Sequence, residues 1–168
     1  MKRYQGIALS LLVSVLVLAV LIWLSPGRLK GNQYANISPS GSVLEAEQAF
    51  FDFGNISMAA GDVSHNFKIK NTGSEPVTIT KIYTSCMCTK ATLIRGDGGK
   101  IGPFGMLGHG VIPSIREILQ PGEEAKIEAI FYPAAHGPAG LGSVERVITM
   151  ENNGKSNLDV SFRANVAP

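Results

Sequence analysis

Several motifs on which enzyme classes depend are missing from the sequence. It contains no G-x-S-x-G motif of a serine hydrolase and no H-E-x-x-H motif of a zinc protease. The short glycine-rich stretch Gly96–Gly99 does not have the form of a phosphate-binding loop, and no helix is expected after it. We therefore do not expect this protein to be an enzyme.

Basic charge is also scarce beyond the N-terminus. The whole chain has a formal charge of +2, but residues 31–168 carry eleven Lys or Arg against thirteen Asp or Glu, which is 11 − 13 = −2. A nucleic-acid-binding domain usually shows a basic patch or stripe. Because none remains here, nucleic acid is not an expected partner.

The longest apolar run lies near the N-terminus. Residues 7–24 carry no charge, and at about 1.5 Å rise per residue they nearly match the roughly 30 Å core of a bilayer. A cleaved signal peptide is the alternative, but the run exceeds the ~7–15 residues of a signal core. No cysteine follows the run, which excludes a lipoprotein anchor. We expect a cytoplasmic tail (1–6), a transmembrane signal anchor (7–24), a flexible linker (25–46) and an extracytoplasmic domain (47–168) at the cell membrane.

Beyond the linker, apolar and polar residues alternate in short segments separated by turns. In the last segment, for example, Leu158, Val160 and Phe162 alternate with polar residues, as in a half-buried strand. The clear segments are 48–54, 63–70, 77–84, 125–132, 143–150 and 158–166. They predict an all-β fold, an antiparallel immunoglobulin-like β-sandwich of about seven strands. Residues 111–119 would supply the remaining strand, although their apolar spacing fits a short helix equally well.

Four motifs in this region resemble the bacterial domain-of-unknown-function family 1573. They are FDFGNI (51–56), the pattern from Gly61 to Ile79, SCMCT (85–89) and QPGEEAKIEAIFYP (120–133). The resemblance covers about 50–133 and implies an immunoglobulin-like fold, related to the major-sperm-protein type, on exported or membrane-anchored proteins. Met87 stands where the family usually has glycine, and the segment after Cys88 is longer. The family has no established activity.

Cys86 and Cys88 are the only cysteines, so the inter-sheet disulfide of many immunoglobulin domains is absent. They could be packed in the core, joined to each other, active in thiol redox chemistry or bound to a metal. In a regular strand, Cβ atoms of residues i and i+2 are roughly 6–7 Å apart, whereas a disulfide requires about 3.8 Å. This geometry disfavours the disulfide. The C-x-x-C motif at a helix start, typical of thioredoxin-like redox sites, is also absent.

Two glycine-rich segments carry further soft or imidazole ligands. Met106 and His109 lie in 95–111, and His136 lies in 134–142. In a sandwich whose loops alternate between two ends, both segments and the cysteines fall at the same end if residues 111–119 form a strand; a helix there would change the count. Thiolates, a thioether and imidazoles suit Cu(I) first and Zn(II) second. The predicted metal ligands are Cys86, Cys88, Met106, His109 and His136. His65 and Met87 are additional candidates, although such a histidine is more often a core residue and such a methionine more often a packing residue.

The expected function is therefore a non-enzymatic binding or structural module of the cell envelope, with an envelope protein as its partner. Binding of Cu(I), or less favourably Zn(II), at the cysteines is the alternative function. Thiol redox activity is the third.

Overall fold

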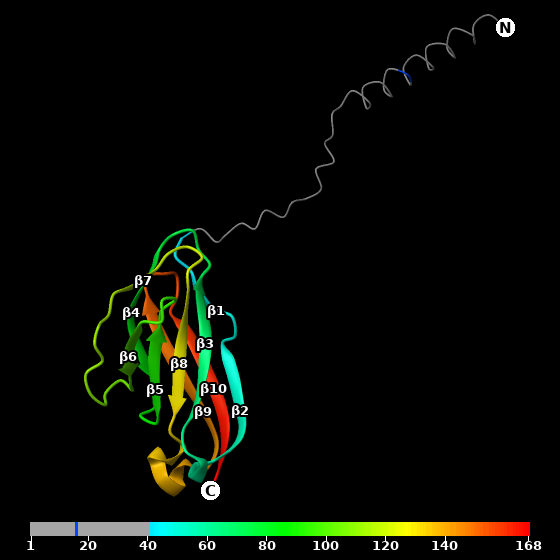
Figure 1. Cartoon of the computed structure of the whole chain (residues 1–168), viewed down its shortest axis with the longest axis vertical. Helices are drawn as coiled ribbons and strands as arrows, with labels where there is room; N and C mark the ends of the chain where they lie inside the picture. Colours follow the sequence, from blue (N-terminus) through cyan, green and yellow to red (C-terminus); the bar gives the residue numbers. More distant parts are fainter. Residues whose placement is uncertain (1–15, 17–40) are drawn as a thin grey trace, which may run out of the picture. The chain divides into compact units, whose positions relative to one another are not determined.

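The computed structural model describes Leu16 and residues 41–168. Residues 41–168 consist mainly of short strands connected by turns (Figure 1). Two 3-10 segments, η1 and η2, interrupt them. The elements are β1 (Leu44–Ala46), β2 (Phe50–Ser57), η1 (Met58–Ala60), β3 (Val63–Asn71), β4 (Val77–Thr84), β5 (Thr89–Ile94), β6 (Lys100–Phe104), β7 (Glu117–Leu119), β8 (Glu124–Phe131), η2 (Pro133–Gly140), β9 (Gly142–Asn152) and β10 (Leu158–Ala167).

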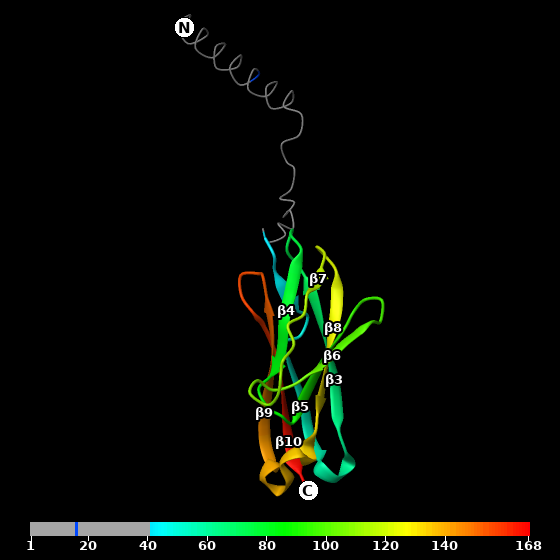
Figure 2. The ribbon, with the colours of Figure 1, turned by 90° about the vertical axis from the view of Figure 1, so that its left-hand side faces the viewer.

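The strands form two sheets of five strands each, which face one another as the two layers of a sandwich (Figure 2). One sheet has the order β1-β3-β8-β5-β6 and the other β2-β10-β9-β4-β7. Neighbouring strands are antiparallel except for β2 and β10, which run parallel. The all-β sandwich expected from the sequence is thus confirmed.

The core lies between the two sheets and follows from the alternation in the strands. In β10, Val160, Phe162 and Ala164 are fully buried, while the residues between them face outward. The ring of Phe162 lies 5.4 Å from that of Phe131 on β8, so aromatic side chains from both sheets meet in the interior. Each fully buried side chain of this size contributes roughly 1.5–3 kcal/mol to stability.

The strand number exceeds the predicted seven because β1, β5 and β6 were not predicted: β5 precedes the glycine-rich segment 95–111, and β6 lies inside it. In β5, Thr89, Ala91 and Thr92 are all buried, so small and polar residues hide the usual alternation. β6 contains Gly102 and Pro103, which are poor strand formers. Pro103 is tolerated because β6 is an edge strand, where a missing N–H donor need not break a hydrogen bond between strands.

Two boundaries also differ from the prediction. Leu44–Ala46 was expected to be linker, but it forms β1, with Leu44 buried and paired with Asn71. Three residues are too few to show a period in the sequence. Residues 111–119 are neither a full strand nor a helix: only Glu117–Leu119 forms β7, and the backbone N–H of Ile115 donates to Thr80 O at 2.9 Å.

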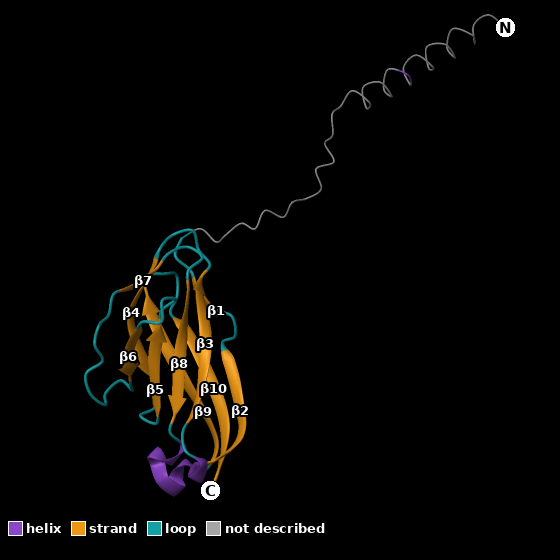
Figure 3. Cartoon of the chain, in the orientation of Figure 1, coloured by secondary structure: helices purple, strands orange, loops and turns teal. Residues whose placement is uncertain are grey.

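Within the described residues, no helix has both the length and the apolar character needed to cross a bilayer. Apart from Leu16, the predicted span 7–24 lies outside the described residues. The two 3-10 segments contact each other at one end of the sandwich, near the C-terminus (Figure 3). The β4–β5 turn (85–88) lies beside them, because Tyr132 N–H donates to Cys88 O at 2.9 Å. We call this the cysteine end.

Candidate functional site

Cys86 and Cys88 lie in a tight turn between β4 and β5, and not in an extended strand. The Thr89 N–H donates to Cys86 O at 3.1 Å, which closes the turn. The Thr84 hydroxyl also reaches Cys86 O, at 2.9 Å. Met87, at the centre, does not adopt a positive φ, so the turn forms without the glycine usual in the related family.

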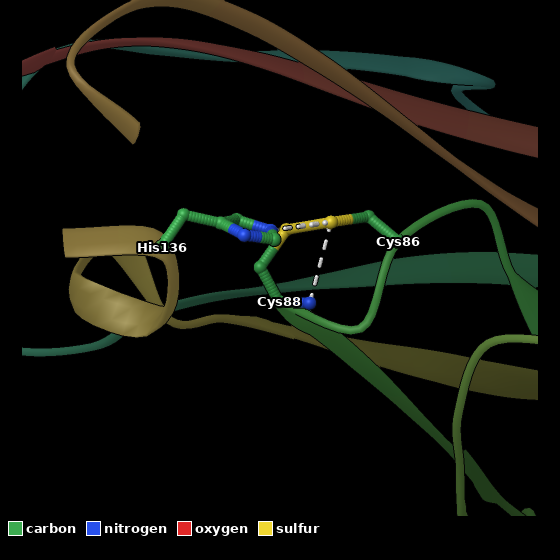
Figure 4. A group of neighbouring side chains, drawn as sticks. All are labelled: Cys86, Cys88 and His136. Atoms are coloured by element: carbon green, nitrogen blue, oxygen red, sulfur yellow. Dashed lines mark hydrogen bonds between the residues drawn. A yellow bond between two sulfur atoms is a disulfide. The ribbon is translucent and has the colours of Figure 1, made fainter. Parts of the chain in front are cut away.

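The turn joins the two cysteines in a disulfide (Figure 4). The sequence argument against this bond was wrong because it assumed an extended strand. Two residues of rise would separate the Cα atoms by about 6.6 Å, whereas the turn reduces their separation to 5.2 Å, within the usual range for disulfides. The chain therefore carries a local disulfide ring at the cysteine end.

The two sulfur-bearing residues differ in their environments. Cys88 is 0% exposed and belongs to the hydrophobic core, whereas Cys86 is only partly buried. Met87 between them is 46% exposed, so it is not the packing residue that the sequence favoured. An external reagent thus has access to the disulfide from the Cys86 side.

His136 meets the disulfide at that accessible side. Its Nε2 lies 3.2 Å from Cys86 Sγ, and η2 carries the imidazole toward the sulfur atoms (Figure 4). A disulfide sulfur has no hydrogen to give, so a hydrogen bond here requires His136 Nε2–H as the donor. Within η2, Gly137 has a φ of 54° and a non-helical ψ, which turns the chain directly after the histidine. The predicted proximity of His136 to the cysteines is confirmed.

Arg146 contacts the other sulfur and was not singled out from the sequence. Its Nε donates to Cys88 Sγ at 3.0 Å, and its Nη1 donates to Glu145 O at 2.8 Å. Burial lowers the pKa of the Arg146 guanidinium, and the described residues give it no carboxylate partner within salt-bridge distance. The available signal was its parity: Arg146 follows Val144 and precedes Ile148 on the inward face of β9.

The remaining predicted histidines do not join this group. Among the His, Cys, Asp and Glu side chains of the described residues, Cys86, Cys88 and His136 form the set whose ligand atoms lie within 4.8 Å of one another. His109 is exposed and outside that set. The Met106 backbone pairs with Thr84 in an isolated bridge, which places it beside the end of β4.

His65 also has another role than metal binding. Its ring stacks on Phe51, with 3.7 Å between centroids and 10° between planes, and meets Phe67 edge-on at 4.7 Å. Burial lowers the pKa of His65. It is a half-buried packing residue on the inward face of β3, as its position in the strand indicated.

The fold and site define a β-sandwich with a local Cys-x-Cys disulfide held between a histidine and an arginine. Residues 44–97, which include both cysteines, match the model of the family described as "Protein of unknown function (DUF1573)". This match confirms the family resemblance seen in the sequence and ends before the segment 120–133.

No curated protein matches the chain. Among solved structures, a protein of unknown function from Porphyromonas gingivalis W83 is similar, with 14% identity, a TM-score of 0.53 and coverage of 76% of this chain and 48% of that one. This chain thus spans about half the length of that protein. The ASH/PapD-like domain of human CEP192 (PapD-like domain 7) has 11% identity and a TM-score of 0.45, with 74% and 84% coverage. At 14% identity, the first likeness shows the sandwich fold alone.

Proposed function

We propose that this chain is a membrane-anchored, extracytoplasmic immunoglobulin-like module whose Cys86–Cys88 disulfide exchanges with the thiols of an envelope protein. The observation that carries the proposal is the asymmetry of the disulfide. Cys86 is accessible and touches the His136 imidazole, whereas Cys88 is 0% exposed. The proposal keeps the binding role expected from the sequence and adds thiol–disulfide exchange with the bound partner.

The exchange proceeds in two balanced steps. A thiolate of the partner attacks Cys86 Sγ; a partner–Cys86 bond forms, the Cys86–Cys88 bond breaks, and Cys88 leaves as a thiolate. A second thiolate of the partner then attacks the partner sulfur of this mixed disulfide and releases Cys86. The partner dithiol is oxidised to a disulfide, and this chain takes up the two electrons. The reverse steps, with a disulfide-bonded partner, restore the ring.

Access favours Cys86 as the sulfur that is attacked, and His136 is placed to assist its later release. Exchange rates depend on which sulfur an incoming thiolate can reach. Cys88 is enclosed by the core, so only Cys86 is open to a partner. His136 Nε2 at 3.2 Å from Cys86 Sγ is placed to hydrogen-bond that sulfur when it is released.

Site-specific trapping tests this assignment. In the full chain in detergent, Cys88→Ser leaves the accessible thiol and Cys86→Ser leaves the buried one. With oxidised glutathione, we expect the mixed disulfide at Cys86 to form at least about tenfold faster than that at Cys88, because access limits attack. Mass spectrometry measures both rates, and thermal unfolding shows that each variant is folded. Equal rates in folded variants, or a wild-type disulfide that dithiothreitol leaves intact under native conditions, would refute the proposal.

A second candidate is binding of Cu(I) by the reduced form of the same site. The ligand atoms of Cys86, Cys88 and His136 lie within 4.8 Å of one another, which supports a shared ion once the disulfide is reduced to two thiols. Soft thiolates select Cu(I), whereas structural Zn(II) usually takes four ligands and the set has three. Two thiolates with Cu(I) carry a net −1, and the Arg146 guanidinium against Cys88 Sγ compensates it. The Met106 thioether is the candidate for a fourth ligand.

Anaerobic titration of the reduced full chain with Cu(I) tests this second candidate. We expect one equivalent to bind in the wild type and none at this site in the Cys86→Ser/Cys88→Ser variant. His136→Ala should weaken binding, and His109→Ala should leave it unchanged because His109 lies outside the cluster. Equal binding by the double-cysteine variant and the wild type would rule out the site.

A further inference from the structure

Arg146 occupies a position where a sandwich normally places an apolar side chain. It lies on the inward face of β9, two residues from the fully buried Ile148 and opposite Phe162 of β10. A charged side chain at the edge of a core is costly to desolvate unless it is paired. The described residues give Arg146 no carboxylate, and its only side-chain partner is the sulfur of Cys88.

We propose that Arg146 is a catalytic residue of the exchange reaction: its guanidinium stabilises Cys88 as a thiolate when the disulfide opens. This inference rests on the proposed function and adds to it the group that determines which sulfur leaves and how strongly the site oxidises its partner. In the oxidised state, Nε–H donates to a neutral sulfur at 3.0 Å. Once Cys88 leaves, the same cationic donor faces an anion, so the hydrogen bond becomes an ion pair and the interaction strengthens.

The burial of Cys88 makes this stabilisation necessary. A thiolate at a 0% exposed position has no water to solvate it. Cys88 N–H points instead to Cys86 Sγ at 3.3 Å, and the Thr89 hydroxyl lies 3.9 Å from Cys88 Sγ. Arg146 is therefore the nearest cation and the strongest donor on this sulfur. Stabilising the thiolate favours the reduced form, so the disulfide becomes a stronger oxidant.

The two sulfurs also differ in the polar group that contacts each of them. Arg146 contacts Cys88 and His136 contacts Cys86, so the two polar groups approach the disulfide from opposite ends. In exchange, a sulfur that is stabilised as an anion leaves faster. Burial hides Cys88 from attack and Arg146 favours its departure, and both effects direct the incoming thiolate to Cys86.

The test compares reduction potentials of four full-length proteins at one fixed pH. They are the wild type, Arg146→Gln, Arg146→Lys and the control Arg163→Gln. Arg163 is matched because it is also an arginine of the β2-β10-β9-β4-β7 sheet, but it is exposed and pairs with Asp52 at 2.7 Å, away from the sulfurs. Each protein is equilibrated in glutathione or dithiothreitol buffers, and thiols are counted by alkylation and mass spectrometry.

We expect Arg146→Gln to lower the equilibrium constant for reduction at least tenfold, which is about 30 mV for a two-electron couple. Arg146→Lys should restore part of the difference because it keeps the charge, and Arg163→Gln should match the wild type. If Arg146→Gln does not fold, the reduction potential of Arg146→Lys and the rate at which glutathione attacks its disulfide still test the role of Arg146. A folded Arg146→Gln protein with the wild-type potential would overturn the role of Arg146. A wild-type disulfide that glutathione and dithiothreitol cannot reduce would overturn the proposed function itself.

Discussion

Reduction of the Cys86–Cys88 disulfide should cost the sandwich little stability. A disulfide stabilises mainly by closing a loop in the unfolded chain, and this loop contains three residues. The loop-closure relation with n = 3 corresponds to about 1.6 kcal/mol at 25 °C, which is below the loss typical of structural disulfides in small secreted domains, about 2–5 kcal/mol. The two sheets and the core between them need no cross-link, because the bond joins neighbouring residues of one turn.

Urea and thermal unfolding of the full chain, oxidised and reduced, measure this difference. For a domain of about 130 residues, 1.6 kcal/mol corresponds to a fall in Tm of about 6 °C. Unfolding should stay cooperative after reduction. A loss above about 4 kcal/mol, or unfolding on reduction at 25 °C, would show that the disulfide is a structural cross-link. It would then refute the reasoning that the bond is free to open and close.

Three further results should follow. His136→Ala should slow the release of Cys86 from its mixed disulfide with glutathione about tenfold or more without lowering Tm, because the exposed imidazole contacts Cys86 Sγ and little of the core; an unchanged rate would contradict this. Asn71→Ala should cost about 2–4 kcal/mol in urea unfolding, because its buried amide donates to Glu75 O and Leu119 O and accepts from Gly73 N–H; a loss under 1 kcal/mol would be too small. Burial lowers the pKa of His65 from its usual 6.5, so the unfolded chain protonates first. The wild type should hold its stability above about pH 6.5 and lose it as pH falls through the folded-state pKa, and His65→Phe should lose less over that interval.

The sequence predicted the regular strands well because their alternation is strong. β4, for example, begins and ends at the predicted Val77 and Thr84. It failed where small or polar residues are buried, as in β5, where Thr89 and Thr92 carry no apolar signal. It also failed at edge strands such as β6, which tolerate Gly and Pro. In these segments tertiary packing determines the structure, and local propensity does not.

The candidate site was predicted in part. Counting strand ends placed His136 at the cysteine end. This placement is correct because β5, β6 and the segment 105–119 run between the two ends of the sandwich three times, and three passes end at the same side as the single strand that was assumed. The turn at Cys86–Cys88 was missed because the segment was treated as a continuation of the strand. Arg146 was missed because a charged residue in an alternating segment is normally assigned to the solvent side. Its inward parity, between Val144 and Ile148, was the only local signal.

The reduction potential of the Cys86–Cys88 disulfide tests the central claim most directly. The full chain is equilibrated in glutathione and dithiothreitol buffers, and the reduced fraction is measured by alkylation and mass spectrometry. We predict a midpoint between roughly −270 and −120 mV, the range of proteins that exchange disulfides. A disulfide that remains intact below about −300 mV, as structural disulfides do, would contradict the account.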